Sequence, residues 1–466
     1  MPSRDHDDPV EPGPADTGRL GNRLLASIST SAATVLISLF TGVVSARLLG
    51  ADGRGQVAAV STWLLTLSWS AALGFFEALA FYTTRAKITS AEALSWTIVA
   101  VPVLGLVGVL AGEVLIPLGF AAQSADTQRL AQLAFLGIPL VLGEAAGWEL
   151  LMGQRRFRML NAMRVAQPLS YAVGLAALAV TGHVTPGMVL LIQVASYGLC
   201  YLTIVVVLLS RGGLGPLRIR HARLGLGYGL RLQGVALGDM VSARLDVMVL
   251  PAFVAGTAVG FYAIAVNVAS MLMTLFGTLW MIVFPIAGSA DPETAQEVIQ
   301  RGLRLALLGS TSVAVALGIV APWLLPTVYG AEFAGAVTPL WLLLPGAVFW
   351  SGSSIVSAGL RAAGAPGRAS LVQIAGIAIT VAGLLLTLPR FGILGAAATS
   401  TVAYAVTFLA TAVTLHRRSG FSLAATVHPA AVVGDLRWVL DRARTLISTG
   451  PRAQRGARGH ADSARQ

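Results

Sequence analysis

Four apolar runs, at 97–120, 185–209, 305–328 and 371–389, constrain the fold of this chain more than any other feature. Each run approaches or exceeds the roughly 20 residues that an α-helix needs to cross the hydrocarbon core of a bilayer. The chain is 55% hydrophobic and only 11% charged, whereas soluble domains usually contain about 25% charged residues. No stretch between the apolar runs is long enough to form a separate soluble domain. We therefore predict an all-α integral membrane protein.

Apolar segments between charged residues predict about twelve transmembrane helices. The predicted spans are 23–47, 57–82, 93–119, 129–152, 162–182, 185–210, 225–252, 257–287, 301–328, 335–360, 369–389 and 392–416. An even number of spans places both termini on the same side of the membrane.

The distribution of basic residues predicts which side that is. Arginine supplies nearly all of the net charge of +11, because Lys87 is the only lysine. With the N-terminus in the cytoplasm, the tails and cytoplasmic loops contain 26 of the 32 Lys and Arg residues, and the outside loops contain four. The positive-inside rule favours this arrangement. We predict two cytoplasmic termini and no nucleic-acid partner.

Other chemical signatures are missing from the sequence. Cys200 is the single cysteine and the six histidines are scattered, so we predict no disulfide, no metal site and no cofactor. Residues 1–19 lack a basic segment followed by a short apolar core, which argues against a cleavable signal peptide.

Two weak internal similarities predict a repeat. Residues 49–60 resemble 254–265, with Gly55 aligned to Gly260, and 150–158 resemble 360–368. Two six-helix halves of the same orientation are a common transporter design, with the substrate site between them. The predicted parts are an N-terminal tail at 1–21, a first bundle at 22–210, a basic linker at 211–223, a second bundle at 224–416 and a basic tail at 417–466. An apolar face at 436–447 predicts a short amphipathic helix in that last tail, with a solvated disordered tail as the alternative.

The seventh span contains four charged residues, Arg231, Asp239, Arg244 and Asp246. Each charge at the bilayer centre costs about 2.5–3.5 kcal/mol on insertion scales, so such residues face protein or water. At 100° per residue, Arg231, Asp239 and Asp246 lie within about 80° of one another, and Arg244 points away from this polar stripe. Glycines at 225 and 229, and at 234 and 238, predict close helix approach.

Two interpretations of these charges remain open. The stripe could line a cavity for an anionic ligand, because guanidinium groups bind phosphate bidentately and stay charged when desolvated; the aspartates would then balance the arginines or couple transport to protons. Alternatively, the charges pair with buried glutamates and hold helices together. The glutamates inside other predicted spans are Glu77, Glu113, Glu144 and Glu149.

Several segments together resemble the multidrug/oligosaccharidyl-lipid/polysaccharide (MOP) exporter superfamily, in its polysaccharide transporter branch of Wzx-type flippases. The segments are SARLLGADGRGQ (45–56), RLDVMVLPAFVAGTAVGFYAIAV (244–266), FP (284–285), VYGAEF (328–333) and RFGILGAAATS (390–400). Their order and spacing cover nearly the whole membrane part. Twelve spans, not fourteen, and a first span without several basic residues depart from the lipid II flippase branch, which disfavours a peptidoglycan precursor as substrate.

The resemblance implies two pseudo-symmetric six-helix bundles around a central cavity, in a non-enzymatic flippase of the bacterial plasma membrane. Its implied substrate is an undecaprenyl-pyrophosphate-linked oligosaccharide, with membrane lipids around it and a polysaccharide polymerase and glycosyltransferases as candidate partners. The implied basic cavity makes Arg231 and Arg244 the expected substrate contacts, with Asp239 and Asp246 beside them. Arg47 matches the basic turn of the motif, with interface anchoring as its alternative role.

Two other functions compete with this expectation. A cation-coupled multidrug exporter of the same superfamily would favour an acidic and aromatic cavity, which the arginines of the seventh span argue against. A membrane-embedded polysaccharide polymerase or ligase would need a large external loop bearing catalytic Arg or His. No predicted outside loop exceeds about a dozen residues, so the enzyme is disfavoured.

Overall fold

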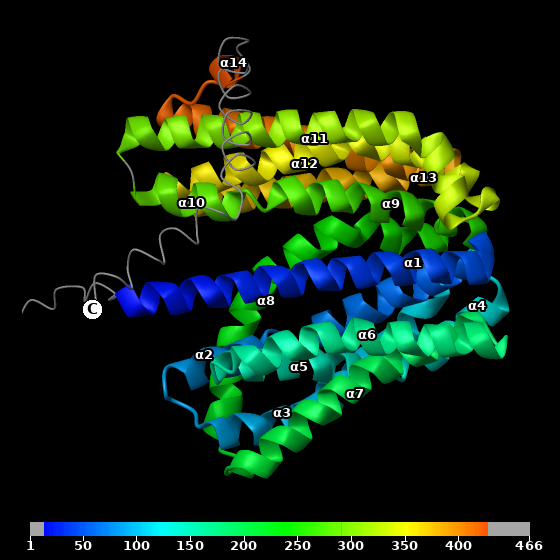
Figure 1. Ribbon diagram of the computed structural model, residues 1–466, viewed down its shortest axis with the longest axis vertical. Coiled ribbons are helices and arrows are strands. Elements are labelled where there is room, and N and C mark those ends of the chain that lie inside the picture. Colours follow the sequence, from blue (N-terminus) through cyan, green and yellow to red (C-terminus); the bar gives the residue numbers. More distant parts are fainter. Residues whose placement is uncertain (1–13, 290, 427–466) are drawn as a thin grey trace, which may run out of the picture. The chain divides into compact units, whose positions relative to one another are not determined.

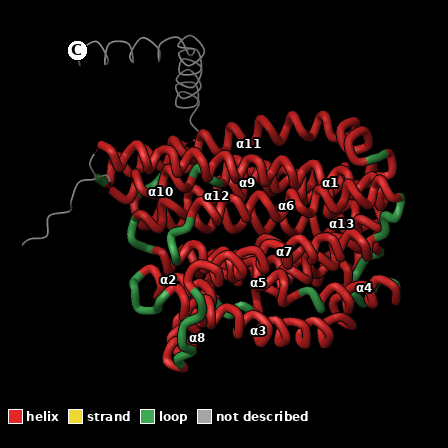
Figure 2. The backbone as a smooth tube through the Cα atoms, turned by 60° about the horizontal axis from the view of Figure 1, so that its bottom comes forward, coloured by secondary structure: helices red, strands yellow, loops and turns green. Residues whose placement is uncertain are grey.

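The computed structural model describes residues 14–289 and 291–426, which form helices joined by loops (Figure 1, Figure 2). The elements are α1 (Pro14–Ala71), α2 (Phe75–Thr84), α3 (Ser90–Gly119), α4 (Ala125–Phe135), α5 (Ile138–Gly153), α6 (Phe157–Thr181), α7 (Pro186–Gly212), α8 (Ile219–Val249), η1 (Leu250–Ala252), α9 (Gly256–Gly277), α10 (Trp280–Ser289), α11 (Pro292–Tyr329), η2 (Ala331–Ala336), α12 (Val337–Ala362), α13 (Pro366–Ser419) and α14 (Leu423–Thr426). The predicted amphipathic helix at 436–447 lies outside the described residues.

The predicted spans correspond to these helices in order. Within the described residues, eight helices are long and apolar enough to cross a membrane, or nine if the bent pair α4 and α5 forms one span. Helices α1 and α13 are each broken in two, at Gly50 (φ 69°) and Gly392 (φ 53°), where the backbone is non-helical. Only glycine adopts positive φ without steric penalty. Each break lies at a junction between predicted spans, which confirms an all-helical fold with about twelve membrane helices.

Three predicted spans are not single straight helices. The span at 57–82 is divided between α1 and α2, with Gly74 at φ 65° before α2. The span at 129–152 is the pair α4 and α5, bent by 44°, and 257–287 is divided between α9 and α10. The sequence is apolar on both sides of each break, so hydropathy alone contains no signal for the interruption.

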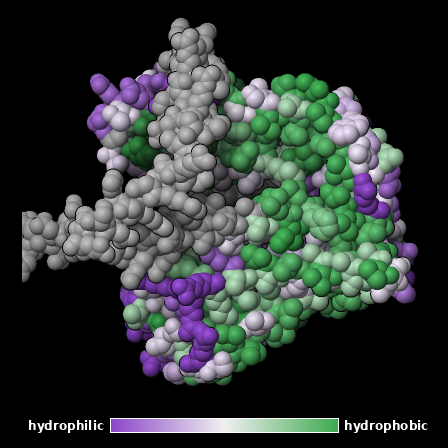
Figure 3. Space-filling model, viewed as in Figure 1, coloured by the Kyte–Doolittle hydropathy of each residue, from purple (hydrophilic) through white to green (hydrophobic). Residues whose placement is uncertain are grey.

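The outer face of α3 shows why water is an unsuitable solvent for this chain. Val103, Leu106, Leu110, Val114 and Leu118 follow helical spacing, and each side chain is more than half exposed. Figure 3 shows hydrophobic residues over the flanks of the helices and hydrophilic residues gathered near their ends. Contiguous apolar surface of this extent is unusual on soluble monomers and marks a membrane or partner interface. The protein is therefore a multi-pass membrane protein.

The described residues form two compact units. Unit 1 runs to Ile264 and also contains Trp323–Val337 and Leu388–Ile393, and unit 2 contains the other described residues. In unit 1, buried side chains of α2, α3, α5 and α7 form a core, including Phe76, Leu94, Leu142 and Ile204. In unit 2, the core includes Leu303, Ile355, Phe408 and Leu415 from α11, α12 and α13. Unit 1 includes α8, which packs on α1 and α2; the predicted division into bundles at 22–210 and 224–416 stays a prediction.

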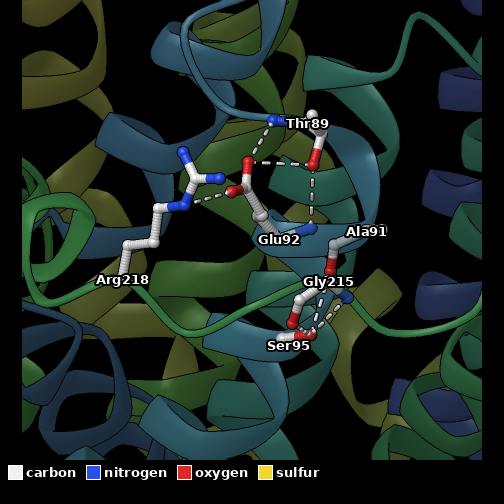
Figure 4. Close-up of polar contacts among 6 residues, drawn as sticks. All are labelled: Thr89, Ala91, Glu92, Ser95, Gly215 and Arg218. Carbon is white, nitrogen blue, oxygen red and sulfur yellow. Dashed lines mark hydrogen bonds and ion pairs between the residues drawn. The ribbon is translucent and has the colours of Figure 1, made fainter.

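The segment before α8 is attached to the start of α3 (Figure 4). The Thr89 hydroxyl accepts a hydrogen bond from the Glu92 amide at 3.2 Å, and the Glu92 carboxylate accepts one from the Thr89 amide at 3.0 Å. This is a capping box, which satisfies two otherwise unpaired amides. Arg218 lies 3.4 Å from the same carboxylate, and the Ser95 hydroxyl donates to the Gly215 carbonyl at 2.8 Å. These contacts position the first turn of α8. The predicted site lies further along the same helix.

The predicted repeat segments contact each other within unit 1. A Cβ atom on Gly55 would lie 1.8 Å from the carbonyl oxygen of Gly256, and one on Gly260 would lie 2.0 Å from that of Ala51. Ala51 and Gly256 are 205 positions apart in the sequence, as are Gly55 and Gly260. Shifting each residue of one contact to its equivalent in the other repeat therefore gives the second contact. This reciprocity supports the alignment of 49–60 with 254–265.

Candidate functional site

Helix α8 is positioned by close backbone contact with α2, beside which it runs in Figure 1. A Cβ atom on Gly229 would lie 2.6 Å from the Gly74 carbonyl, and one on Gly225 would lie 2.6 Å from the ring of Phe75. The backbone contact at Gly229 leaves no room for a side chain, and a side chain at Gly225 would force the ring of Phe75 to shift. The prediction that Gly225 and Gly229 permit close helix approach is confirmed; the side chains at 232–243, which include the second glycine pair, lie outside the description.

The two arginines of the predicted site on α8, Arg231 and Arg244, have exposed side chains. Neither Arg231 nor Arg244 forms an ion pair or hydrogen bond with a residue in the described part of the chain. The structure therefore does not support the alternative in which Arg231 pairs with a buried glutamate. No described residue occupies the guanidinium donors of Arg231 or Arg244, and the side chain of Asp239 is outside the description.

Asp246, in contrast, is buried and hydrogen-bonded. One carboxylate oxygen accepts a hydrogen bond from the hydroxyl of Tyr262 at 2.6 Å, and the other accepts one from the amide of Val247 at 2.8 Å. The side chain of Tyr262 is completely buried. This pair joins α8 to α9, so the predicted stripe does not continue as one exposed surface from Arg231 to Asp246.

Replacing Tyr262 with phenylalanine tests this structural role. The change removes a donor to a buried carboxylate, and hydrogen bonds to charged groups contribute about 1.5–3 kcal/mol. We expect a clearly lower melting temperature of the purified protein in detergent. Tyr201→Phe is the matched control, because Tyr201 is partly buried and forms no hydrogen bond with a described residue. Equal melting temperatures for the two variants would show that the Asp246–Tyr262 contact contributes nothing to stability.

Arg47 contacts backbone rather than another side chain. Its Nε donates a hydrogen bond to the carbonyl of Val328 at 2.7 Å, and an Nη donates to the carbonyl of Thr327. These carbonyls belong to the last turn of α11, where no helical amide is available to them. The contact fits the anchoring role; the predicted contact of Arg47 with substrate stays a prediction.

Arg54, in the same basic turn, differs from Arg47 in its burial. Its Nε is inaccessible to solvent and has no hydrogen-bond partner among the described residues. The groups that interact with it electrostatically are Tyr171 of α6 and Tyr329 of α11. The sequence does not separate the two arginines, because both lie beside the turn at Gly50. This unpaired donor adds Arg54 to the candidate site residues.

The interior of unit 1 also contains carboxylates. Glu144 on α5 is 5% exposed, and one oxygen each of Glu144 and Glu77 is buried without a hydrogen-bond partner among the described residues. Glu149 on α5 interacts electrostatically with Glu77 on α2. Within residues 14–289 and 291–426, however, no group of three or more His, Cys, Asp or Glu residues is arranged to hold a metal ion.

Comparison with solved structures defines the class of protein. The chain is similar to the lipid II flippase MurJ in an inward closed conformation, with a TM-score of 0.68 at 14% identity, covering 84% of this chain and 87% of that one. It is also similar to an inward-facing multidrug resistance MATE transporter, with a TM-score of 0.66 at 14% identity, covering 85% and 99% of the two chains. A MOP superfamily transporter from Pyrococcus furiosus gives a TM-score of 0.52 at 14% identity, covering 86% and 95%. The fold is that of the MOP exporter superfamily.

The family follows from a match along the sequence. The model of the family described as polysaccharide biosynthesis protein matches residues 44–338, more than half of the chain. The chain belongs to this family, in the polysaccharide transporter branch of the MOP superfamily, as the sequence resemblance predicts. The solved structures that share its fold are named as a flippase and as transporters. A search of curated proteins finds no match.

Proposed function

We propose that this protein moves undecaprenyl-pyrophosphate-linked oligosaccharide from the cytoplasmic to the outer leaflet of the bacterial plasma membrane. The observation that carries the proposal is the pair of exposed arginines, Arg231 and Arg244, on a helix of a polysaccharide biosynthesis family member. Guanidinium groups bind the oxygens of phosphates bidentately and remain charged when water is removed. The similarity to a structure named as a lipid II flippase supports a lipid-linked substrate.

The arginines lower the free-energy barrier that the charged head group meets when it crosses the bilayer. A single charge at the bilayer centre costs about 2.5–3.5 kcal/mol or more, and a pyrophosphate carries more than one. Arg231 and Arg244 neutralise this charge while the two sequence halves, 22–210 and 224–416, expose the site to each side in turn. Asp239 prevents excess positive charge in the empty site.

Placement in the cell follows from the basic residues. Both termini lie in the cytoplasm, because this orientation agrees with the positive-inside rule. The substrate is then collected on the cytoplasmic side, where glycosyltransferases assemble it, and delivered to a polymerase outside. These enzymes and the surrounding lipids are the proposed partners.

Lipid analysis of cells that lack the protein tests the proposed function. Undecaprenyl-pyrophosphate glycan should accumulate on the cytoplasmic face, and the wild-type gene should relieve the accumulation. Sidedness is measured by accessibility of the glycan to an impermeant reagent in inverted and right-side-out vesicles. Accumulation of the glycan on the outer face instead would contradict the proposal.

One observation favours a second function, export of cationic drugs. The similarity to the multidrug resistance transporter covers 99% of that chain, and Glu144 and Glu77 have buried carboxylate oxygens without hydrogen-bond partners among the described residues. Increased sensitivity of the deletion strain to cationic drugs, with no glycan accumulation, would favour this function.

A further inference from the structure

Two aromatic residues of α2 and one of α8 form a cluster with a guanidinium group at its edge. The rings of Phe81 and Tyr228 are stacked, with centroids 4.7 Å apart and planes at 12°. Tyr82 meets Tyr228 edge to face at 5.8 Å. The guanidinium carbon of Arg85 lies 4.4 Å from the centroid of the Phe81 ring. We call Arg85, Phe81 and Tyr228 the Arg85 stack.

The ring of Phe81 contacts the guanidinium of Arg85 without using the hydrogen-bond donors of the arginine. Arg85 has an exposed side chain and forms no ion pair or hydrogen bond with a described residue. A guanidinium held over an aromatic ring uses none of its N–H donors in that contact, and these donors form a fork that matches two phosphate oxygens. The ring contact also restricts the side chain before a ligand arrives, which lowers the entropy loss on binding.

Further positive charges surround the stack. Lys87 Nζ lies 6.0 Å from the centroid of the Tyr82 ring. Arg231 follows Tyr228 by three positions on α8, so it lies on the same face of the helix, one turn further along. Its side chain is also exposed and unpaired among the described residues. The loop after α2 thus places Arg85 and Lys87 beside these aromatic rings, and α8 adds Arg231 one turn beyond Tyr228, all within unit 1.

We propose that the Arg85 stack, together with Arg231 and Lys87, is a binding site for the pyrophosphate of the lipid-linked substrate at the predicted cytoplasmic end of α2 and α8. The inference rests on the proposed function and adds the place where the substrate is first captured. Arg85 supplies the bidentate contact, Lys87 adds a mobile charge, and Arg231 receives the pyrophosphate as it moves along α8. The aromatic rings exclude water from one side of the guanidinium and strengthen its attraction to the anion.

Binding of undecaprenyl pyrophosphate to the full-length protein in nanodiscs tests this site. Arg85→Lys keeps the charge but removes the bidentate fork, and we expect about tenfold weaker binding. Phe81→Leu should have a similar effect, because the guanidinium loses its ring while its charge remains. Arg223→Ala is the matched control: this arginine is exposed on α8 and forms no ion pair or hydrogen bond with a described residue, and its loss should leave binding unchanged.

The outcomes separate the site from general charge attraction and from membrane lipids. Wild-type affinity in Arg85→Lys, or an equal loss in Arg223→Ala, would overturn the proposal. Competition by phosphatidylglycerol as effective as that by inorganic pyrophosphate would assign the site to membrane lipid and overturn its assignment to the substrate. If deletion cells accumulate the glycan but Arg85→Lys binds normally, the inference fails and the proposed function stands. If binding falls in Arg85→Lys but no glycan accumulates, the phosphate site stands and the proposed function fails.

Discussion

Replacing Gly55 with alanine is expected to reduce the yield of folded protein severely. The new Cβ atom would lie 1.8 Å from the carbonyl oxygen of Gly256, less than any non-bonded contact allows. The obstructing atoms are backbone atoms, so no rotamer change relieves the clash and the two helices must separate. Overpacking of a tight contact typically costs about 1–3 kcal/mol and sometimes more, and we expect the upper end here. The measurement is the melting temperature and the monodisperse yield in detergent.

Gly42 provides the control for this substitution. It lies in the same helix α1, and nothing lies within 4 Å of the position where its Cβ atom would be. Alanine is a better helix former than glycine by about 1 kcal/mol, so Gly42→Ala should be neutral or slightly stabilising. If Gly55→Ala and Gly42→Ala have the same melting temperature, the backbones of α1 and α9 do not approach as closely as the contact between Gly55 and Gly256 indicates.

Replacing Arg231 with alanine is expected to abolish transport while leaving membrane expression and melting temperature unchanged. The side chain is exposed and unpaired among the described residues, so its removal leaves none of the described groups without a partner. A charge-assisted contact with phosphate contributes about 1.5–3 kcal/mol, which corresponds to roughly a 10- to 100-fold loss of rate. Transport is measured as relief of glycan accumulation in the deletion strain, and expression as the fluorescence of a tagged protein in membranes.

Arg220→Ala is the matched control for this experiment. Arg220 is exposed in the first turn of α8, on the predicted cytoplasmic side, and its loss should preserve transport. A parallel fall in folded yield and transport for Arg231→Ala would indicate a structural residue. Normal transport in Arg231→Ala would remove this arginine from the substrate path.

Most of the membrane architecture could be predicted from local sequence. Length and hydropathy locate spans because a helix needs about 20 apolar residues to cross a bilayer wherever its neighbours lie. The breaks near Gly74 and between α4 and α5 were not predicted. A membrane helix is apolar on all sides, so a bend leaves no change of periodicity to detect.

The candidate site was predicted less completely. Helical spacing places Arg231 and Asp246 on one face of α8, but the buried hydrogen bond of Asp246 to Tyr262 depends on the packing of α9. Arg47 and Arg54 flank one turn, yet Arg47 binds carbonyls of α11, whereas Arg54 is half-buried and interacts with Tyr171. Partners from distant segments of the chain decide these roles, and a single sequence contains no signal for them.

The sequence by itself therefore determined that the chain lies in a lipid bilayer, that it is all-helical, in which order its spans follow and that α8 is charged. These properties depend on residue composition and on spacing within one helix. Only the tertiary structure decided which of these residues meet: Gly55 with Gly256, Asp246 with Tyr262, and the ring of Phe81 with that of Tyr228. Such contacts join segments that are far apart along the chain, and the fold alone brings them within bonding distance.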